Sequence, residues 1–267
     1  MKLLTTNKQL KKSLSDAQTV KLLEYLYQLE QPVILREIRA AFTEDQQLDK
    51  RLDLLIQTGV VERMDRRYRL ILPIYQEFPD DLLTDQLEKL IGSADLLNFV
   101  EQFYPEELAG PVAVTFDLAS RTVIENETYA IVTLNKKSFL QPSLPNYFYY
   151  QQQKRPEQFE DLEKLLGDVN PAFFFNQVEL LLDSLLKGKK PKRTSIFLES
   201  LVMTKLAILE PTVQVDAPIV RIEDLSPDVV ELWQQADEMT RYFTFHQLVQ
   251  RLMGSEDTLS YIISKKD

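Results

Sequence analysis

Apolar residues recur at helical spacing near the start of the chain. In residues 15–30 the apolar positions lie three residues apart, at Val20, Leu23, Leu26 and Leu29. This period predicts a helix with one buried face. Ser15 and Gln18 have the spacing of a capping box, in which side chains accept the free N–H groups of the first turn, so we expect the helix to begin there. Pro32 ends it.

Two more helices follow in the same pattern. Residues 33–42 predict a short extended segment and then a helix that turns Leu35, Ile38 and Phe42 inward. Thr43 and Gln46 repeat the capping-box spacing and open a third helix. The apolar side of this third helix is formed by Leu48, Leu52, Leu55 and Ile56. Gly59 stands where a left-handed residue would end it.

A two-stranded hairpin is predicted next. Its strands are Val60–Arg63 and Tyr68–Leu72, joined by the turn "MDRR". The order of helix, short strand, helix, helix and ribbon over residues 15–75 resembles the winged helix-turn-helix family. In particular, "LREIRAAF" followed by "LDKRLDLLIQTGVVERMDRRYRLIL" resembles the second helix, recognition helix and wing of bacterial regulators in that family.

The resemblance implies a DNA-binding surface. In such a domain the third helix enters the major groove and the wing contacts the backbone or the minor groove. The third helix would then expose Gln46, Gln47, Asp49, Lys50, Arg51 and Asp53. Gln pairs with adenine edges and Arg with guanine edges, so Gln46, Gln47 and Arg51 are candidates for base contacts, with Lys50 beside them. On the wing the candidates are Arg63, Arg66, Arg67 and Arg69, of which Arg66 and Arg67 lie at the tip.

Acidic residues on the same helix favour an alternative. Phosphate would be repelled by Glu44, Asp45, Asp49 and Asp53. Winged helices also bind proteins, so the same module could dock on a protein instead of on duplex DNA. The sequence leaves both interpretations open.

The charge distribution is uneven along the chain. Of its 31 Lys and Arg residues and 41 Asp and Glu residues, residues 1–75 hold 13 and 10, which leaves 18 and 31 for the rest. A basic head on an acidic body is expected if only the head contacts phosphate.

The rest of the chain predicts a second, larger domain. The acidic, Pro-containing segment 73–86 indicates a linker. The segments after it predict one or two helices over 85–104, two or three antiparallel strands over 110–140, and helices from 157 onward. Asn170–Pro171 and Ser226–Pro227 each combine a capping residue with a Pro suited to the first helical position. The fold class predicted is α+β, mostly helical, with a winged helix at 1–76 and a domain at 80–267 that has a small antiparallel sheet.

Several features of the second domain have a functional and a structural interpretation. The loop 187–193 carries Lys187, Lys189, Lys190, Lys192 and Arg193, which form either a solvated loop or a second contact for phosphate or for an acidic partner. The aromatic segment 145–159 suits either base stacking or the edge of a core. Tyr147–Tyr150 and Phe173–Phe175 are candidates for a homodimer interface through residues 80–267. His246 flanks an apolar helix face and is interpreted as structural.

Composition argues against an enzyme. The chain has no Cys, one His and six Gly that are isolated from one another, so Cys-based sites, most His-based sites and glycine-rich phosphate loops are missing. A carboxylate nuclease would use Asp117, Glu127 and Lys136, but Leu134 stands where an acidic residue is needed. No cofactor or metal is expected. Since no apolar run is long enough to span a bilayer and no signal peptide is evident, a cytoplasmic protein without membrane contact is predicted.

The sequence thus predicts a non-catalytic DNA-binding protein that regulates transcription. Its third helix would read bases and its wing would contact phosphates. The alternative is a protein-interaction module.

Overall fold

The chain folds into two compact units of mixed α/β structure. The computed structural model describes residues 2–105, 107–136, 141–151, 153, 156–191 and 193–266. Unit 1 consists of Met1–Asp81, Pro105–Phe116 and Glu238–Phe243, and unit 2 of Leu82–Tyr104, Asp117–Asp237 and Thr244–Asp267. The first segment of unit 1 ends just after the boundary predicted at 76–80. The return of two later segments to unit 1 was not predicted.

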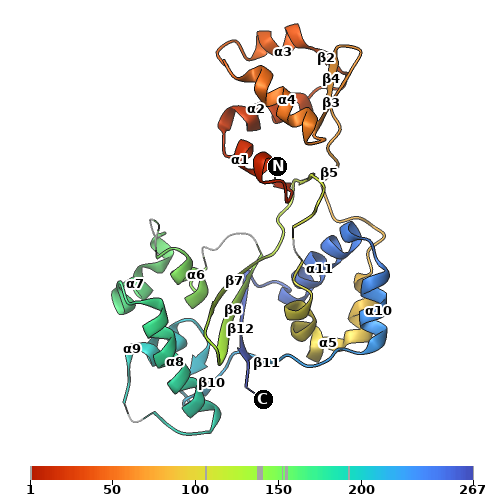
Figure 1. Cartoon of the computed structure of the whole chain (residues 1–267). Helices are drawn as coiled ribbons and strands as arrows, with labels where there is room; N and C mark the ends of the chain where they lie inside the picture. The colour runs from red at the N-terminus through yellow and green to blue at the C-terminus, as the bar shows by residue number, and fades with distance from the viewer. Residues whose placement is uncertain are drawn as a thin grey trace. The chain divides into compact units, whose positions relative to one another are not determined.

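Unit 1 contains four helices of its own and two three-stranded sheets within the described residues (Figure 1). Its elements are β1 (Lys2–Leu4), α1 (Lys8–Leu14), α2 (Ala17–Tyr27), β2 (Val33–Ile34), α3 (Leu35–Ala41), α4 (Leu48–Gln57), β3 (Val61–Met64), β4 (Arg67–Leu70), β5 (Ile74–Tyr75) and β6 (Val112–Val114). One sheet has the order β2-β4-β3 and the other β1-β6-β5. Helices α2, α3 and α4 and the first sheet pack around a single hydrophobic core. Its buried members include Leu22, Ile38, Leu52, Leu55, Val61 and Tyr68.

The helix starts of unit 1 differ from the predicted capping boxes. Asp16, not Ser15, caps α2, because its carboxylate accepts the N–H of Gln18. The third helix, α4, begins at Leu48 rather than after Thr43. Here the carboxylate of Asp45 accepts the backbone N–H of Gln47 at 2.9 Å, which organises a turn before the helix. Strand β1 and helix α1 were not predicted.

The β3–β4 hairpin closes with a two-residue turn. Asp65 and Arg66 both have positive φ, 51° and 62°. This conformation belongs to the type I′ turn, whose twist matches that of the strands it joins. The turn "MDRR" predicted at residues 64–67 is therefore confirmed, with Met64 paired to Arg67.

Unit 2 is built on a four-stranded sheet with the order β11-β12-β8-β7. Its elements are α5 (Thr84–Gln102), β7 (Ser120–Glu125), β8 (Tyr129–Asn135), α6 (Leu144–Tyr149), η1 (Glu157–Phe159), α7 (Glu160–Leu166), α8 (Pro171–Leu186), α9 (Ile196–Met203), β9 (Ala207–Ile208), β10 (Gln214–Val215), β11 (Ile219–Arg221), α10 (Pro227–Gln235), α11 (Glu238–Met253) and β12 (Thr258–Ser264). The first six residues of α11 belong to unit 1. β11 runs parallel to β12, and the other neighbours are antiparallel.

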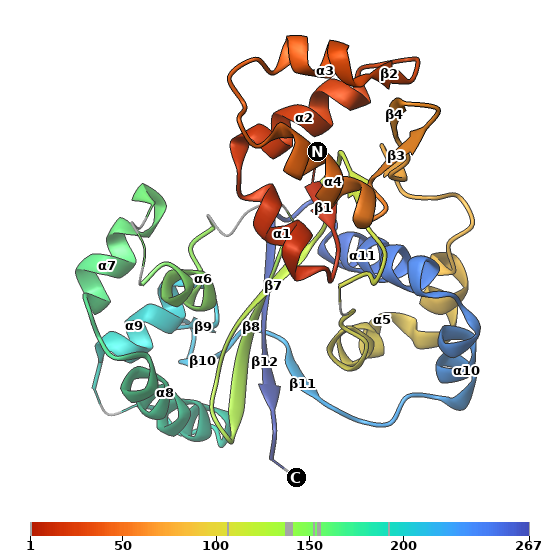
Figure 2. The same cartoon turned by 45° about the horizontal axis from the view of Figure 1, so that its top comes forward.

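Helices cover both faces of this sheet (Figure 2). Along β8, Ala130, Val132 and Leu134 pack with residues of α5, α10 and α11. The alternate residues Tyr129 and Ile131 pack with α6, α7, α8 and α9 on the opposite face. Because successive side chains of a strand point to opposite faces of the sheet, β8 contributes to two separate hydrophobic cores.

The strand predictions for unit 2 are incomplete. The strands expected over 110–140 include β7 and β8, but β6 joins a sheet of unit 1, and residues 137–140 lie outside the described range. The helical region expected from residue 157 also contains β9 to β12. The two predicted caps are confirmed, because Asn170 accepts the N–H of Phe173 and Ser226 that of Val229.

Helix α5 is two helices joined at Gly92. This residue has φ 72° and ψ 164°, a conformation that is essentially restricted to glycine. Of the two interpretations of this segment, one helix or two, the second is therefore correct, because Gly92 interrupts the helical backbone. A Cβ on Gly92 would meet no atom within 4 Å, so any cost of a side chain there comes from backbone strain alone.

We expect Gly92→Ala to lower the free energy of unfolding by about 1–3 kcal/mol, because alanine is strained at this φ and ψ. Gly110→Ala is the matched control, since Gly110 also has open space around it but no positive φ. Its effect should stay within about 0.5 kcal/mol. Urea unfolding followed by circular dichroism measures both, and equal effects would contradict the assignment of strain.

Candidate functional site

The candidate surface consists of the turn 43–47, helix α4 and the β3–β4 hairpin, all in unit 1. It holds every residue predicted to contact DNA. The structure separates these residues into a buried group, a paired group and a group that is open to solvent.

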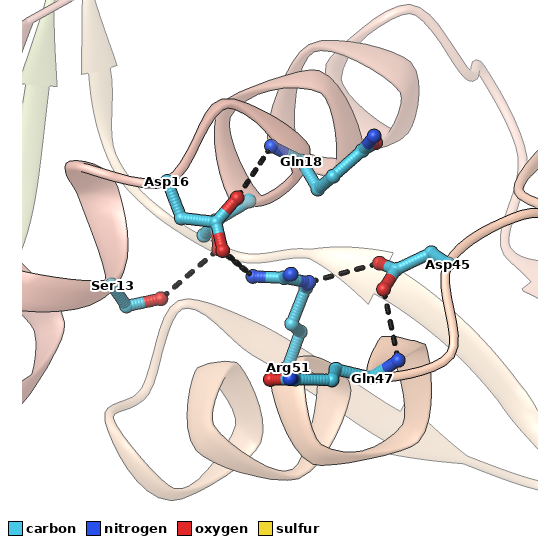
Figure 3. A network of polar contacts seen from close by, with 7 residues as sticks. Ser13, Asp16, Gln18, Asp45, Gln47 and Arg51 are labelled. Atoms are coloured by element: carbon cyan, nitrogen blue, oxygen red, sulfur yellow. Dashed lines mark hydrogen bonds and ion pairs between the residues drawn. The ribbon is translucent and has the colours of Figure 1, made fainter.

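Arg51 is the mostly buried member, and Figure 3 shows its polar contacts. Its Nη1 donates to Asp16 Oδ2 at 2.6 Å and to Thr19 Oγ1 at 3.0 Å, and its Nε donates to Asp45 Oδ2 at 2.9 Å. Only 13% of the side chain is exposed. The prediction that Arg51 faces solvent and reads a base is therefore wrong: its N–H groups are directed at two carboxylates.

The Arg51 network, made of Arg51, Asp16, Asp45 and Thr19, ties three segments together. Asp16 lies between α1 and α2, Asp45 lies in the turn before α4, and Arg51 lies on α4. The Gln18 N–H and then Arg51 hold the pKa of the Asp16 carboxyl below its ordinary value. Burial would lower the pKa of Arg51, but its bonds to Asp16 and Asp45 raise it above the ordinary value. The Asp16 carboxylate and the Arg51 guanidinium therefore both stay charged over the physiological pH range.

Two of the four carboxylates expected to repel phosphate are neutralised. Asp45 is 5% exposed and paired with Arg51. Asp49 pairs with Arg39 of α3 at 2.7 Å. Glu44 and Asp53 remain exposed.

The polar candidates near the start of α4 lie partly outside the helix. Gln46 and Gln47 belong to the preceding turn, and Lys50 lies in the first turn of α4. All three are exposed. Gln46, Gln47 and Arg51 therefore do not share one exposed helical face, contrary to the prediction.

The hairpin carries four arginines in different surroundings. Arg69 Nε donates to Glu62 Oε2 at 2.6 Å, because the two residues are paired across the strands. Arg67 Nη1 donates to the carbonyl of Pro32 at 3.1 Å. The guanidinium carbon of Arg63 lies 5.5 Å from the centroid of the Tyr68 ring. Arg66 occupies the exposed turn. Among the described residues no carboxylate pairs with Arg63, Arg66 or Arg67.

The other candidates lie in unit 2. Lys187, Lys189, Lys190 and Arg193 are exposed, and Lys192 lies outside the described residues. In the aromatic segment Tyr147 and Phe148 are buried, which favours the core interpretation, while residues 152, 154 and 155 lie outside the described range.

Most of the apolar residues proposed for a dimer are used by the core of unit 2. Phe174 and Phe175 are buried and only Phe173 of that trio is exposed. In the other stretch Tyr149 is exposed. His246 is buried, as the structural interpretation predicts.

A second cluster, in unit 2, was not predicted. Arg121 Nε and Nη2 donate to the two oxygens of Glu101 at 3.2 and 2.8 Å, and Tyr261 donates to the same carboxylate. Burial raises the pKa of Tyr261 far above its ordinary value. The cluster joins α5 to β7 and β12. Its members are paired with one another, which indicates a structural role for the cluster. No local spacing in the sequence links residues so far apart.

Within the described residues, no group of three or more acidic or His side chains is placed to hold a metal ion. No described helix is long and apolar enough to cross a membrane. Of the residues considered for a nuclease, Leu134 is buried, and Lys136 Nζ donates to the carbonyl of Gly254 at 2.6 Å.

We expect Arg51→Met to lower the free energy of unfolding by about 2–3 kcal/mol, because it leaves the Asp45 carboxylate buried without its cation. Lys50→Met removes the adjacent exposed cation and should cost no more than about 0.5 kcal/mol. Adding Asp45→Asn to Arg51→Met should recover part of the loss. Urea unfolding by circular dichroism measures all three, and equal effects at positions 50 and 51 would contradict the network.

The lowered pKa of Asp16 sets a pH dependence. Its stabilising contribution is present above the ordinary value of 3.8 and is lost as pH falls through the lower pKa of the folded state. Asp16→Asn should therefore be less stable than wild type at pH 7, and the difference should shrink below pH 3.8. Unfolding curves between pH 2 and 7 test this; a difference that is constant with pH would contradict it.

Comparison with known proteins concerns the first part of the chain. A family model described as a domain of unknown function (DUF1803) matches residues 2–104. This range includes the Arg51 network, the β3–β4 hairpin and α5. No curated protein and no solved structure matches the chain. Residues 2–104 are thus similar to that domain, whose description states no activity.

Proposed function

We propose that residues 17–70 form a winged helix that binds duplex DNA, with the β3–β4 hairpin as its main phosphate contact. The order α2, β2, α3, α4, β3, β4 and the sheet β2-β4-β3 support this interpretation. Two helices and an adjoining hairpin with a basic tip are the parts that such a domain needs to reach a groove and the backbone beside it.

The observation that carries the proposal is the state of the hairpin arginines. Arg63, Arg66 and Arg67 have no carboxylate partner among the described residues, whereas Arg39, Arg51 and Arg69 are all paired with acids. Phosphate is the ligand for which unpaired guanidinium groups are suited, since it accepts their N–H groups in pairs. The type I′ turn places Arg66 and Arg67 at the end of a short two-stranded ribbon.

The burial of Arg51 changes the expected mode of recognition. Only Gln46, Gln47 and Lys50 are left to approach base edges, and the two Gln residues lie on a turn. Phosphate contacts position a protein on DNA but carry no sequence information directly. We therefore propose binding that is dominated by the backbone and is weakly selective for sequence. Regulation of transcription would then require a second head or a partner to supply specificity.

Protein docking is the second candidate function. Met64 is 59% exposed and Ile71 43% exposed on the same hairpin, and Asp53 and Glu44 remain free to pair with a basic partner. The two functions differ in their response to salt. Phosphate binding releases condensed counterions, whereas apolar docking is little affected.

The test is duplex binding by the full chain as a function of salt. Arg66→Ala with Arg67→Ala should weaken binding to every sequence and reduce the slope of log affinity against log salt by about 0.9 for each lost contact. Lys89→Ala with Lys205→Ala removes the same charge from exposed positions of unit 2 and should leave the slope unchanged. Fluorescence anisotropy with pooled duplexes measures both.

Two results would refute the proposal. One is the absence of wild-type binding near about 50 mM salt, where a few phosphate contacts suffice for measurable affinity. The other is an equal loss of slope in both double variants, which would show attraction by net charge rather than by the hairpin.

A further inference from the structure

One edge of the four-stranded sheet in unit 2 is open. β7 forms one edge, and α6 packs along it, with Thr122 Oγ1 donating to Asn146 Oδ1 at 2.6 Å. β11 forms the other edge. An open edge can pair with further strands, and proteins normally cover or disrupt it.

The hydrogen-bond pattern of β11 shows which of its backbone groups point outward. Ile262 N donates to Pro218 O at 2.9 Å, and Ile219 is the register partner of Ile262. In a parallel pair, bonded residues alternate along each strand, so Pro218 and Val220 face β12. The N–H and C=O groups of Ile219 and Arg221 therefore point away from the sheet. No hydrogen bond joins them to another residue in the described part of the chain.

Asn98 shows how the same edge is covered two residues further on. Its Oδ1 accepts from Glu223 N at 3.3 Å and its Nδ2 donates to Glu223 O at 2.8 Å. The amide side chain of α5 thus makes the pair of bonds that a neighbouring strand would make. This coverage ends at Glu223, and the outward groups of Ile219 and Arg221 are left without it.

A groove runs beside the open part of the edge. It has a volume of about 470 Å³ and lies between α5 and β11, with Asp95, Leu97 and Asn98 on one side and Pro218–Arg221 on the other. Ile219 is 44% exposed and Ile222 50% exposed. The groove thus offers backbone partners, apolar side chains and an acidic wall in one place.

We propose that this groove binds an extended, positively charged peptide segment of a partner protein, which adds to β11 as a fifth strand. Main-chain bonds to Ile219 and Arg221 hold such a segment, as in other cases of strand addition. Its cationic side chains meet the exposed carboxylates of Asp95 and Glu223, which outnumber the single cation of Arg221 in the lining of the groove.

The occupant is a single peptide rather than a second copy of this chain. Asn98 brings α5 into hydrogen-bond contact with the edge at Glu223. A lone strand needs only the space beside Ile219, whereas a second copy would also have to place its own β12 and helices beside this edge. The proposal concerns unit 2 and is independent of DNA binding by unit 1.

The probe is a fluorescein-labelled peptide of sequence Lys-Val-Lys-Val-Lys-Val-Lys, titrated with the full chain and followed by anisotropy. Ile219→Pro removes one outward N–H and leaves the bonds between β11 and β12 intact. It should weaken binding about tenfold, whereas Ile219→Val, which keeps the N–H, should stay within about twofold. The peptide Lys-Pro-Lys-Pro-Lys-Pro-Lys has the same charge but lacks alternate N–H groups, and should bind about tenfold more weakly.

Asp95→Lys is a second variant, outside the sheet, that should also weaken binding. It keeps the test decisive if Ile219→Pro fails to fold, which circular dichroism would reveal. The proposal is overturned if wild type shows no binding below about 1 mM peptide, if Asp95→Lys or a folded Ile219→Pro binds like wild type, or if both peptides bind equally. A concentration-dependent dimer that Ile219→Pro abolishes would assign the edge to a second copy and overturn it as well.

Discussion

The guanidinium of Arg51 is largely enclosed by the surrounding chain of unit 1, together with the carboxylate of Asp45. It reaches Asp16 before α2, Thr19 within α2 and Asp45 before α4, so the position of α4 depends on a cation that solvent barely touches. A buried carboxylate without its partner lowers the free energy of unfolding, so the contacts among the three segments depend on one another. The pairing also withdraws the guanidinium from any ligand. In the proposed function, phosphate contacts are therefore left to the other basic residues of unit 1.

Cross-strand pairing on the hairpin likewise determines which of its arginines have a carboxylate partner. Glu62 is the register partner of Arg69, and their charges cancel at the base of the ribbon. Arg63 is opposite Tyr68 and packs its cation against the ring, while Arg66 sits in the turn. The hairpin arginines without a carboxylate partner thus lie toward its tip.

Local patterns predicted the helix periods, the hairpin turn and two helix caps of unit 2, but not the starts of α2 and α4. The period of α2, α3 and α4, the turn at 64–67 and the caps at Asn170 and Ser226 each depend on residues within a few positions of one another. The Arg51 network does not, because Asp16 and Arg51 are 35 residues apart. An arginine on a helix surface and an arginine in a buried ion pair have the same sequence signature. The role of Arg51 was mistaken for this reason.

The strands of unit 2 illustrate the same limit. β12 pairs with β8 across more than 120 residues and is buried from both sides, so its neighbours exist only in the folded chain. The return of Pro105–Phe116 and Glu238–Phe243 to unit 1 likewise follows from tertiary contacts. The open edge of β11 could not be inferred from the sequence of Ile219–Arg221. It depends on which backbone N–H and C=O groups of these residues form hydrogen bonds with β12.

In the proposed function, unit 1 contacts DNA through the hairpin while Arg51 stays in its ion pairs. Amide hydrogen exchange of the full chain, with and without saturating duplex at low salt, tests it most directly. Slower exchange is expected in peptides covering residues 60–72 and 43–50, with unchanged exchange in those covering 187–193. Slower exchange confined to unit 2, or none anywhere, would contradict it.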